Sequence, residues 1–377
     1  MKIVSTSYTN TPGFKDPRAW LERINFYTGI LEELAKHYEV ESIEQINYSG
    51  ELKRKGVLYH FLNYKKSKIY FPRELHRYIK KMKPDIVFVN GLIFPLQIMQ
   101  LRLKLGRRVK IIVFHRGEKP FRGIKGFLQK LADKMINAYL FTSAEFGKTW
   151  TRFGNISDRK IYEVIQGSSV FSPPAGPGGQ GSGSGQDKTS ARSTLQMDDS
   201  PVFLWVGRLD ANKDPLTVVK AFLRFTEFHP GVKLYMIYQT TELLIELKEL
   251  IQSKNKANEP VRLVGKIPHE QLQTWYSAAD FIISGSHHEG SGIAVCEAMS
   301  CGCIPVVTNI VSFRRMTGPG KCGLLYEPGN EESLLNALLQ TTTLDQEKGR
   351  TKVLKQFKEE LSFEAITKKI EHVIASV

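Results

Sequence analysis

Short apolar runs alternate with amphipathic stretches along the first half of the chain. Four runs rich in β-branched residues end at Gly or polar positions, as buried strands do; they cover residues 2–8, 85–90, 109–114 and 139–142. Between the first two runs, residues 20–37 space their apolar side chains for one face of a helix. Strands that alternate with helices predict a parallel sheet covered on both faces.

The same alternation restarts after residue 200. Strand-like runs recur at 202–206, 233–238, 262–264, 281–284 and 304–308. Helical patterns fill the gaps between these runs, for example over 214–225 and 270–279. The predicted fold class is therefore α/β, with two Rossmann-like domains that are each built on a parallel sheet.

A change of composition separates the two halves. Residues 171–200 are rich in Pro, Gly and Ser and are predicted to form a flexible linker. The repetitive Gly/Ser run at 176–186 is unlike the surrounding sequence, which leaves open whether it is native or engineered. We predict an N-terminal domain over 1–170 and a C-terminal domain over 201–345. A charged helical tail over 346–377 could pack back on the N-terminal domain.

The positive charge of the chain is concentrated in its N-terminal half. The net charge is +15, and residues 1–170 hold 31 Lys and Arg against 15 Asp and Glu. Such an excess either faces an anionic membrane or substrate, or only keeps the protein in solution. No nucleic-acid motif accompanies it, so no nucleic-acid partner is expected.

Two segments carry much of this positive charge. Residues 65–83 hold eight Lys and Arg, and residues 121–136 combine an apolar face with four cations. The second pattern is typical of a helix that lies on anionic lipid, and equally of a helix packed on a core with a solvated basic face. An acidic glycan would use the same charge.

The remaining composition indicates a cytoplasmic protein, and if the basic N-terminal half faces a membrane, that surface is the inner membrane face. Neither a secretory leader nor an apolar run long enough for a membrane span is evident. The four cysteines lack the spacing of zinc ligands, so reduced thiols and no metal site are expected; they are Cys296, Cys301, Cys303 and Cys322.

The segment 286–302 has the pattern of a phosphate site. It follows the strand over 281–284 and opens a helix near Gly292, where free backbone N–H groups and the helix dipole favour an anion. Glu289 precedes this helix and Glu297 lies more than a turn inside it. Both carboxylates can accept hydrogen bonds from hydroxyl groups at the carboxyl edge of the sheet.

A second segment supplies cations at the same edge. Arg208 follows the strand over 202–206, and Lys213 lies five residues later in a loop that leads into a helix. An arginine fork and a lysine point charge are suited to phosphate oxygens. Either segment alone is as easily a solvated loop, but together they indicate a nucleotide site.

These motifs resemble those of the family 4 retaining glycosyltransferases, which have the GT-B fold. The likeness rests on Gly-Arg-Leu at 207–209 with Lys213, on Glu-Gly-x-Gly at 289–292 with Glu297, and on the Gly-Leu-Leu-Tyr-Glu-Pro-Gly segment at 323–329. It implies two Rossmann-like domains that face each other across a cleft.

The resemblance also implies roles for particular residues. Glu297 would bind the ribose hydroxyls, Glu289 the donor sugar, and Arg208 and Lys213 the diphosphate. The remaining nucleotide contacts would come from two loops: Gly265, Lys266 and Ile267 around the base, and Gly290, Ser291, Gly292, Ile293 and Ala294 around the phosphates.

In the N-terminal half, the resemblance points to His115. It follows the strand over 109–114, where family members often carry a histidine that faces the donor sugar and the leaving group. Arg116 and Glu118 would help to shape the acceptor side. The expected catalytic set is therefore His115 with Arg208, Lys213 and Glu289.

The sequence departs from the family pattern at Ser291, where phenylalanine is usual, and it has no Asp-x-Asp motif. The expected function is metal-independent and cofactor-independent retaining transfer of a sugar from a nucleoside-diphosphate sugar to a hydroxyl of a glycan, glycolipid or small molecule. A sugar-nucleotide epimerase or phosphorylase of the same fold, or a non-catalytic nucleotide- or anion-binding protein, are the alternatives.

Overall fold

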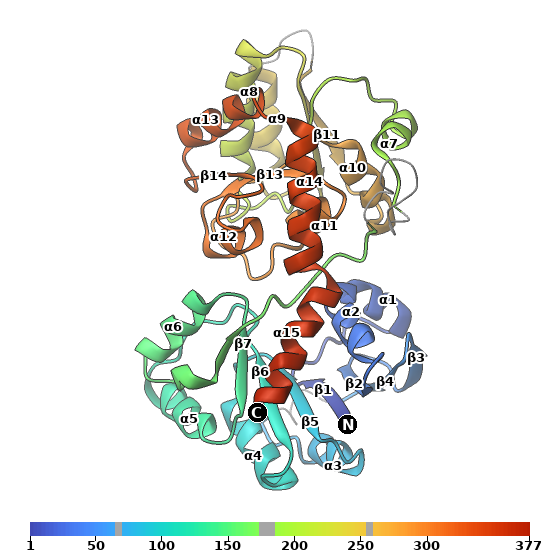
Figure 1. The fold of residues 1–377 in the computed structure, drawn as a ribbon, viewed down its shortest axis with the longest axis vertical. Coiled ribbons are helices and arrows are strands. Elements are labelled where there is room, and N and C mark those ends of the chain that lie inside the picture. Colours follow the sequence, from blue (N-terminus) through green and yellow to red (C-terminus); the bar gives the residue numbers. More distant parts are fainter. Residues whose placement is uncertain (65–69, 173–184, 254–258) are drawn as a thin grey trace. The chain divides into compact units, whose positions relative to one another are not determined.

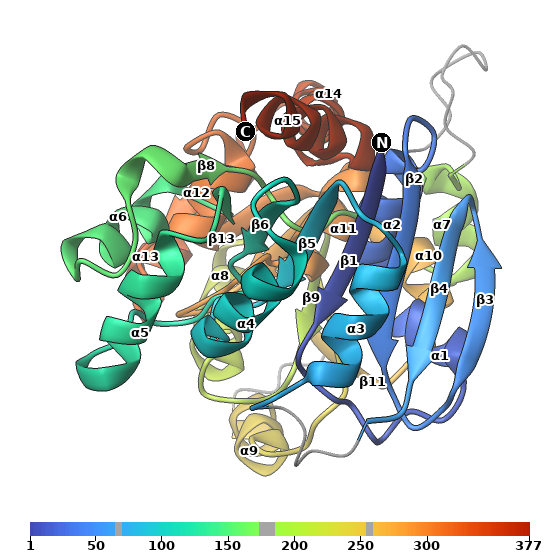
Figure 2. The ribbon, with the colours of Figure 1, turned by 90° about the horizontal axis from the view of Figure 1, so that it is seen from below.

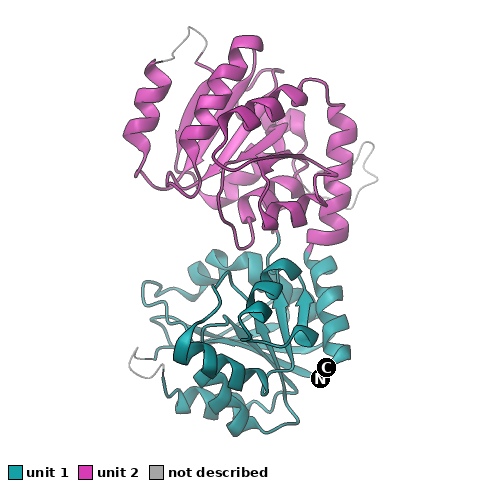
Figure 3. Ribbon diagram, turned by 90° about the vertical axis from the view of Figure 1, so that its left-hand side faces the viewer, with its two compact units in different colours: residues 1–168, 363–377 teal, residues 169–362 magenta. Residues whose placement is uncertain are grey.

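The computed structural model describes residues 1–64, 70–172, 185–253 and 259–377. The chain forms two compact units (Figure 3). The N-terminal unit contains residues 1–168 and 363–377, and the C-terminal unit contains residues 169–362. Each is built on one sheet flanked by helices (Figure 1), which confirms the predicted fold class.

The sheet of the N-terminal unit has eight strands in the order β3-β4-β2-β1-β5-β6-β7-β8. Their bounds are β1 Lys2–Ser7, β2 Glu39–Gln45, β3 Gly50–Arg54, β4 Val57–Leu62, β5 Ile86–Asn90, β6 Lys110–Phe114, β7 Ala138–Phe141 and β8 Ile161–Glu163. All neighbours are parallel except the β3/β4 hairpin. The strand order reverses between β1 and β5.

Helices cover both faces of this sheet because successive strand residues point to opposite sides. On one face, α3 (Arg73–Lys81), α4 (Pro95–Leu105) and α5 (Gly123–Asp133) bury apolar side chains against alternate residues of β5, β6 and β7. Figure 2 shows α3 and α4 side by side in front of the strands.

The single helix predicted over residues 20–37 is two helices in the structure. These are α1 (Pro17–Arg23), capped by the Asp16 side chain, and α2 (Asn25–Leu34). The break falls at Ile24, whose backbone leaves the helical region. Helix α6 (Ala144–Arg152) completes the long helices of this unit before β8.

The sheet of the C-terminal unit has six parallel strands in the order β11-β10-β9-β12-β13-β14. Their bounds are β9 Val202–Gly207, β10 Lys233–Tyr238, β11 Val261–Gly265, β12 Phe281–Ser284, β13 Ile304–Thr308 and β14 Leu324–Tyr326. The helices around it are α7 Lys188–Thr194, α8 Pro215–Phe228, α9 Leu244–Ser253, α10 Leu272–Ala278, α11 Ile293–Ser300, α12 Val311–Thr317, α13 Glu331–Thr341 and α14 Gln346–Gln356. Here the strand order reverses between β9 and β12.

Part of the segment predicted as a linker is folded into the C-terminal unit. Helix α7 packs on α10, and the guanidinium of Arg192 lies 2.7 Å from the Asp280 carboxylate and donates to the Ala278 carbonyl. Both charged side chains are buried. This buried pair anchors residues that composition alone assigns to a loop. Most of the Gly/Ser run, residues 176–184, lies outside the described residues.

The predicted C-terminal tail divides between the two units. Helix α14 belongs to the C-terminal unit, where Gly349 lies against Ile304 of β13. Helix α15 (Phe363–Ser376) belongs to the N-terminal unit and packs on α2. A Cβ atom at Gly29 would lie 2.3 Å from the Phe363 ring, so the glycine allows this close approach. A π-helical turn at Phe357–Leu361 lies between the two helices.

Candidate functional site

Two loops meet where the strand order of the C-terminal sheet reverses. One follows β9 and the other follows β12, and such a reversal is the usual ligand position in open α/β sheets. Gly285 permits their contact, because a Cβ atom there would lie 2.9 Å from the Lys213 carbonyl oxygen and 3.0 Å from that of Asp214. A side chain at this position would push the loops apart.

Asn212 joins the two loops with three hydrogen bonds. Its carbonyl oxygen accepts from the His287 N–H at 2.8 Å, its Oδ1 accepts from the His288 N–H at 3.1 Å, and its Nδ2 donates to the His288 carbonyl at 3.1 Å. The loops are therefore held together by the protein itself. The sequence prediction did not include Asn212, because a loop amide gives no signal until its partner loop is known.

The structure brings together two of the predicted charged residues. The Lys213 ammonium forms an ion pair with the Glu289 carboxylate, and the Ser286 hydroxyl donates to the same carboxylate oxygen at 2.8 Å. Arg208 lies on the first of these loops with its side chain 60% exposed, and its guanidinium is 2.9 Å from Asp210. The arginine thus keeps solvent-facing donors beside the lysine loop.

The N-terminus of α11 opens at the same place. Gly292 precedes it in the left-handed region, with φ of 55°, and its missing Cβ would lie 2.8 Å from the Phe313 ring. Glycine is therefore required there on two counts. In the described part of the chain, the N–H groups of Ile293 and Ala294 have no hydrogen-bond acceptor. Together with the helix dipole they favour an anion.

Glu297 lies one turn into α11 and is 4% exposed. His269 Nε2 is 2.7 Å from one carboxylate oxygen, and the Tyr276 hydroxyl donates to the other at 3.1 Å. Burial raises the pKa of Tyr276 well above its usual range, and the Glu297 charge adds to this shift. The tyrosine is therefore a donor at neutral pH. His269 and Tyr276 were missed because their pairing with Glu297 depends on how α10 and α11 pack.

The loop after β11 leads directly to His269. Gly265 turns the chain with φ of 88°, Lys266 is exposed and Ile267 is half-buried. The ring of His269, four residues after the glycine, stacks on Phe171 with a centroid distance of 5.0 Å. The predicted base-binding loop and the predicted ribose carboxylate are thus linked through one histidine. Ser291 and Gly290, at the other loop, are half-buried.

His115 lies at the end of β6 in the N-terminal unit and is 3% exposed. Its ring stacks on Phe141 with centroids 4.5 Å apart and meets Trp150 edge-on. Nε2 is 2.8 Å from the Glu118 carbonyl oxygen. These contacts hold the loop after β6, and they belong to a different unit from the other candidate residues.

Arg116, predicted to shape the acceptor side, is half-buried beside the reversal of strand order in the N-terminal sheet. Its guanidinium donates to Asn90 and to the Gln166 carbonyl and lies 4.4 Å from the centre of the Tyr27 ring. Burial lowers its pKa from the ordinary value. The Glu118 carboxylate accepts the backbone N–H groups of Arg116 and Leu92, at 2.6 Å and 2.8 Å.

The basic amphipathic pattern over residues 121–136 forms α5, but its buried face is not the predicted apolar one. Gly126, Gln129 and Ala132 face the core, whereas Ile124 and Phe127 are 82% and 61% exposed. A helix can pack closely through small residues, which leaves the larger apolar side chains outside. Of the other predicted basic segment, residues 65–69 lie outside the described residues.

The described residues hold neither a membrane span nor a cluster of metal ligands. No helix among them is long and apolar enough to cross a bilayer. Nor do any three His, Cys, Asp or Glu side chains in these ranges gather as metal ligands. All four cysteines are buried thiols.

The C-terminal unit matches a known family. Residues 186–359 match the family model Glycosyl transferases group 1. A D-inositol 3-phosphate glycosyltransferase from Streptosporangium roseum is 26% identical over 148 residues, which are 37% of this chain and 34% of that relative. The match therefore spans about a third of the relative's length.

Solved structures resemble the whole chain. A glycosyltransferase from Rickettsia africae has a TM-score of 0.74 at 17% identity, covering 100% of this chain and 98% of its own. HepE from Anabaena in complex with UDP also has a TM-score of 0.74, at 13% identity and 100% coverage of both chains. The fold is the two-domain GT-B arrangement of α/β units. Residues 186–359 are thus similar to the group 1 glycosyltransferases, and the chain has the GT-B fold.

Proposed function

We propose that this protein is a retaining, metal-independent glycosyltransferase that moves a sugar from a nucleoside-diphosphate sugar to an acceptor hydroxyl. One observation carries the proposal. Two cations, two carboxylates and the open N-terminus of α11 are gathered around the β9/β12 loops. This combination matches the parts of a sugar nucleotide, which are a diphosphate flanked by two sets of hydroxyl groups.

The diphosphate would be bound from two sides. Arg208 and Lys213 supply charge from the β9 loop, and the N–H groups of Ile293 and Ala294 supply donors from α11. The same groups would stabilise the negative charge that develops on the leaving diphosphate as the glycosidic bond breaks. Lys213 would then divide its charge between the phosphate and Glu289.

The two carboxylates would take different hydroxyl groups. Glu297 is held by His269 and Tyr276, which use two of its four lone-pair directions and leave the others for the ribose hydroxyls. Glu289 would bind the donor sugar from its position before α11. Since Glu289 is already paired with Lys213, its orientation is set before the sugar binds.

Retention would follow from attack on the face that the diphosphate leaves, with the leaving phosphate accepting the acceptor's proton. His115 is the proposed residue on the donor-sugar side. Its bond to the Glu118 carbonyl also fixes the loop after β6. His115→Ala should lower turnover. If His115→Asn then restores the loop but not turnover, the histidine is catalytic. If His115→Asn restores both the loop and turnover, His115 is a positioning residue.

The acceptor would be a glycan, glycolipid or small molecule, and α5 would dock on an anionic membrane. Ile124 and Phe127 are exposed on this helix beside Lys125 and Arg122. Replacing both apolar residues by Glu should abolish flotation with vesicles that contain phosphatidylglycerol. Ile245→Glu, at an exposed apolar residue of the C-terminal unit, is the matched control. Unchanged flotation of the double variant would exclude α5 as the docking surface.

A thermal-shift screen tests the donor site. The screen uses UDP, GDP, ADP and CMP, with UDP first because HepE binds it in its solved structure. A nucleotide at 100 times its dissociation constant stabilises the protein by about 2.7 kcal/mol. We expect a shift with one nucleoside diphosphate that EDTA leaves unchanged and that Arg208→Ala removes. If none of the four shifts the transition, the proposed donor site is wrong.

A further inference from the structure

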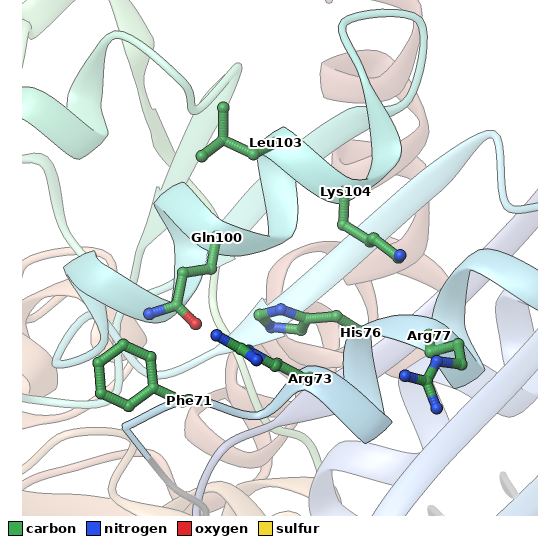
Figure 4. A pocket seen from close by; sticks show the side chains of 7 residues that line it. All are labelled: Phe71, Arg73, His76, Arg77, Gln100, Leu103 and Lys104. Carbon is green, nitrogen blue, oxygen red and sulfur yellow. The ribbon is translucent and has the colours of Figure 1, made fainter.

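The N-terminal unit has a pocket between α3 and α4, and none of the side chains that line it is assigned to the donor. Its volume is about 470 Å³. Seven side chains line it (Figure 4): Phe71, Arg73, His76, Arg77, Gln100, Leu103 and Lys104. All seven belong to the N-terminal unit, whereas the donor candidates around β9 and β12 belong to the C-terminal unit. A pocket of this size can hold a small organic molecule.

Three cations surround the pocket without counter-charges. Arg73 and Arg77 are one helical turn apart on α3, and Lys104 lies in the last turn of α4. Within the described ranges none of the three forms an ion pair, and the lining includes no Asp or Glu. Like charges that converge without partners raise the local potential and favour an anion.

The wall between these cations is buried and neutral. His76 is 3% exposed, and its Nε2 is 2.9 Å from the hydroxyl of the buried Tyr8. Burial, together with the charge of Lys104, lowers the pKa of His76 to about 4. Figure 4 shows the Arg73 guanidinium beside the His76 ring and close to the Gln100 side chain. The charged side chains therefore surround a buried, uncharged histidine.

Two large apolar side chains at the pocket are exposed. Phe71 is 63% exposed and Leu103 is 78% exposed. Phe71 lies just before α3 and Leu103 lies on α4, so the two exposed side chains come from different elements. An inorganic anion would leave both in water. An anion joined to an apolar group would use the cations and the apolar side chains together.

We propose that this pocket binds a phosphate or diphosphate ester whose organic part is apolar. The phosphate oxygens lie against Arg73, Arg77 and Lys104, and the apolar part covers Phe71 and Leu103. The site is additional to the nucleotide-sugar site and stands whether or not the chain transfers sugars. It gives the basic N-terminal half a specific ligand rather than a diffuse surface charge.

Calorimetric titration with geranyl diphosphate tests this site. The titrated protein carries Arg208→Ala and Lys213→Ala, so that diphosphate binding at the nucleotide loops is removed. Adding Arg73→Ala and Arg77→Ala should weaken binding at least about tenfold, because two charge-assisted contacts to the phosphate are lost. Arg107→Ala with Arg108→Ala removes the same charge from exposed residues of the same unit that do not line the pocket, and should leave affinity within about twofold of the starting protein, because solvent screens exposed charges.

Two further arms separate the sources of the phosphate. Leu103→Ala should weaken geranyl diphosphate but not inorganic diphosphate; equal effects would overturn the apolar half of the proposal. Flotation with vesicles that contain phosphatidic acid is measured in protein that carries Ile124→Glu and Phe127→Glu, so that docking through α5 is removed. Flotation that is lost when Arg73→Ala and Arg77→Ala are added would make the ligand a lipid headgroup, whereas titration without flotation would make it a soluble ester. If geranyl diphosphate does not bind, or binds equally well after Arg73 and Arg77 are replaced, the pocket is not a phosphate site.

Discussion

The two units have similar sheets but use the reversal of strand order differently. In the C-terminal unit, charged groups at the β9/β12 reversal are partly exposed, and Arg208 extends into solvent. In the N-terminal unit, the β1/β5 reversal is occupied by side chains that are already hydrogen-bonded to one another: Asn90 donates to the Tyr27 hydroxyl at 2.8 Å and accepts from Arg116, and the Tyr27 and Ser5 hydroxyls lie 2.6 Å apart.

This difference distinguishes residues whose hydrogen-bond donors face solvent from residues that are already hydrogen-bonded within the protein. Arg208 and the N–H groups at the start of α11 keep donors available for a ligand. His115 is instead bonded to a backbone carbonyl, and Arg116 donates to a backbone carbonyl and to Asn90. Changes in the C-terminal loops should therefore act on affinity. Changes in the N-terminal strand-end residues should act first on stability.

The largest effect is expected for Arg208→Ala combined with Lys213→Ala. Two charge-assisted contacts are lost, which should weaken nucleoside-diphosphate binding by about 3–6 kcal/mol. The free energy of unfolding should change by less than about 1 kcal/mol, because both side chains are on partly exposed loops. Titration and urea unfolding of the same protein measure the two numbers. Comparable losses in both would remove the contrast between the units.

His115→Ala should show the opposite pattern. The buried ring leaves a cavity against Phe141 and Trp150, and the Glu118 carbonyl loses its partner. We expect a loss of about 3 kcal/mol in the free energy of unfolding, with nucleotide affinity unchanged. His37→Ala, an exposed imidazole in the same unit, serves as the control. A variant as stable as the native protein would show that the ring is not a packing element.

His76 should make the N-terminal unit acid-sensitive. Its pKa of about 4 lies below the ordinary 6.5, so the folded state disfavours the proton. The contribution of His76 to the free energy of unfolding is fully present above pH 6.5. It is lost as the pH falls from 6.5 toward 4, by up to about 3 kcal/mol. His76→Gln should flatten this part of the stability profile in urea unfolding between pH 7 and 4.5, while His372→Gln, at an exposed residue, should not. An identical slope in native protein and His76→Gln would contradict the assignment.

Gly285→Ala is expected to have the smallest effect. The added Cβ meets two backbone carbonyls within 3.0 Å, so the β9 and β12 loops must separate. We expect a loss of about 1–3 kcal/mol in stability and a weaker nucleotide affinity. Gly231→Ala in the same unit has open space around it and provides the control. Unaltered affinity would mean that contact between the loops is not needed for binding.

The sequence predicted the fold class and nearly all strands of the C-terminal sheet, because parallel buried strands are continuous apolar runs. It missed β2, β3 and β4, whose residues mix charges such as Glu39, Glu41 and Lys53 with apolar ones at an edge of the sheet. It also assigned α7 to a linker, since the buried Arg192–Asp280 pair joins residues 88 positions apart.

The candidate site was predictable where motif and local geometry coincide. Arg208, Lys213, Glu289 and Gly292 lie next to strand ends, so their places follow from the order of strands. Asn212, His269 and Tyr276 could not be predicted because their roles depend on which loops and helices pack together. The exposure of Ile124 on α5 was equally hidden, since it depends on which side the small residues take.

A thermodynamic cycle that combines one ligand change with one residue change tests most directly the claim that the C-terminal unit binds a nucleotide through Glu297. Affinities of UDP and 2′,3′-dideoxy-UDP, or of the corresponding pair for whichever nucleoside diphosphate the screen selects, are measured with native protein and with Glu297→Gln. Native protein should lose at least about tenfold in affinity when the hydroxyls are absent, and the variant should lose less than about threefold. Equal affinity of native protein for both ligands, or undiminished discrimination by Glu297→Gln, would contradict the account.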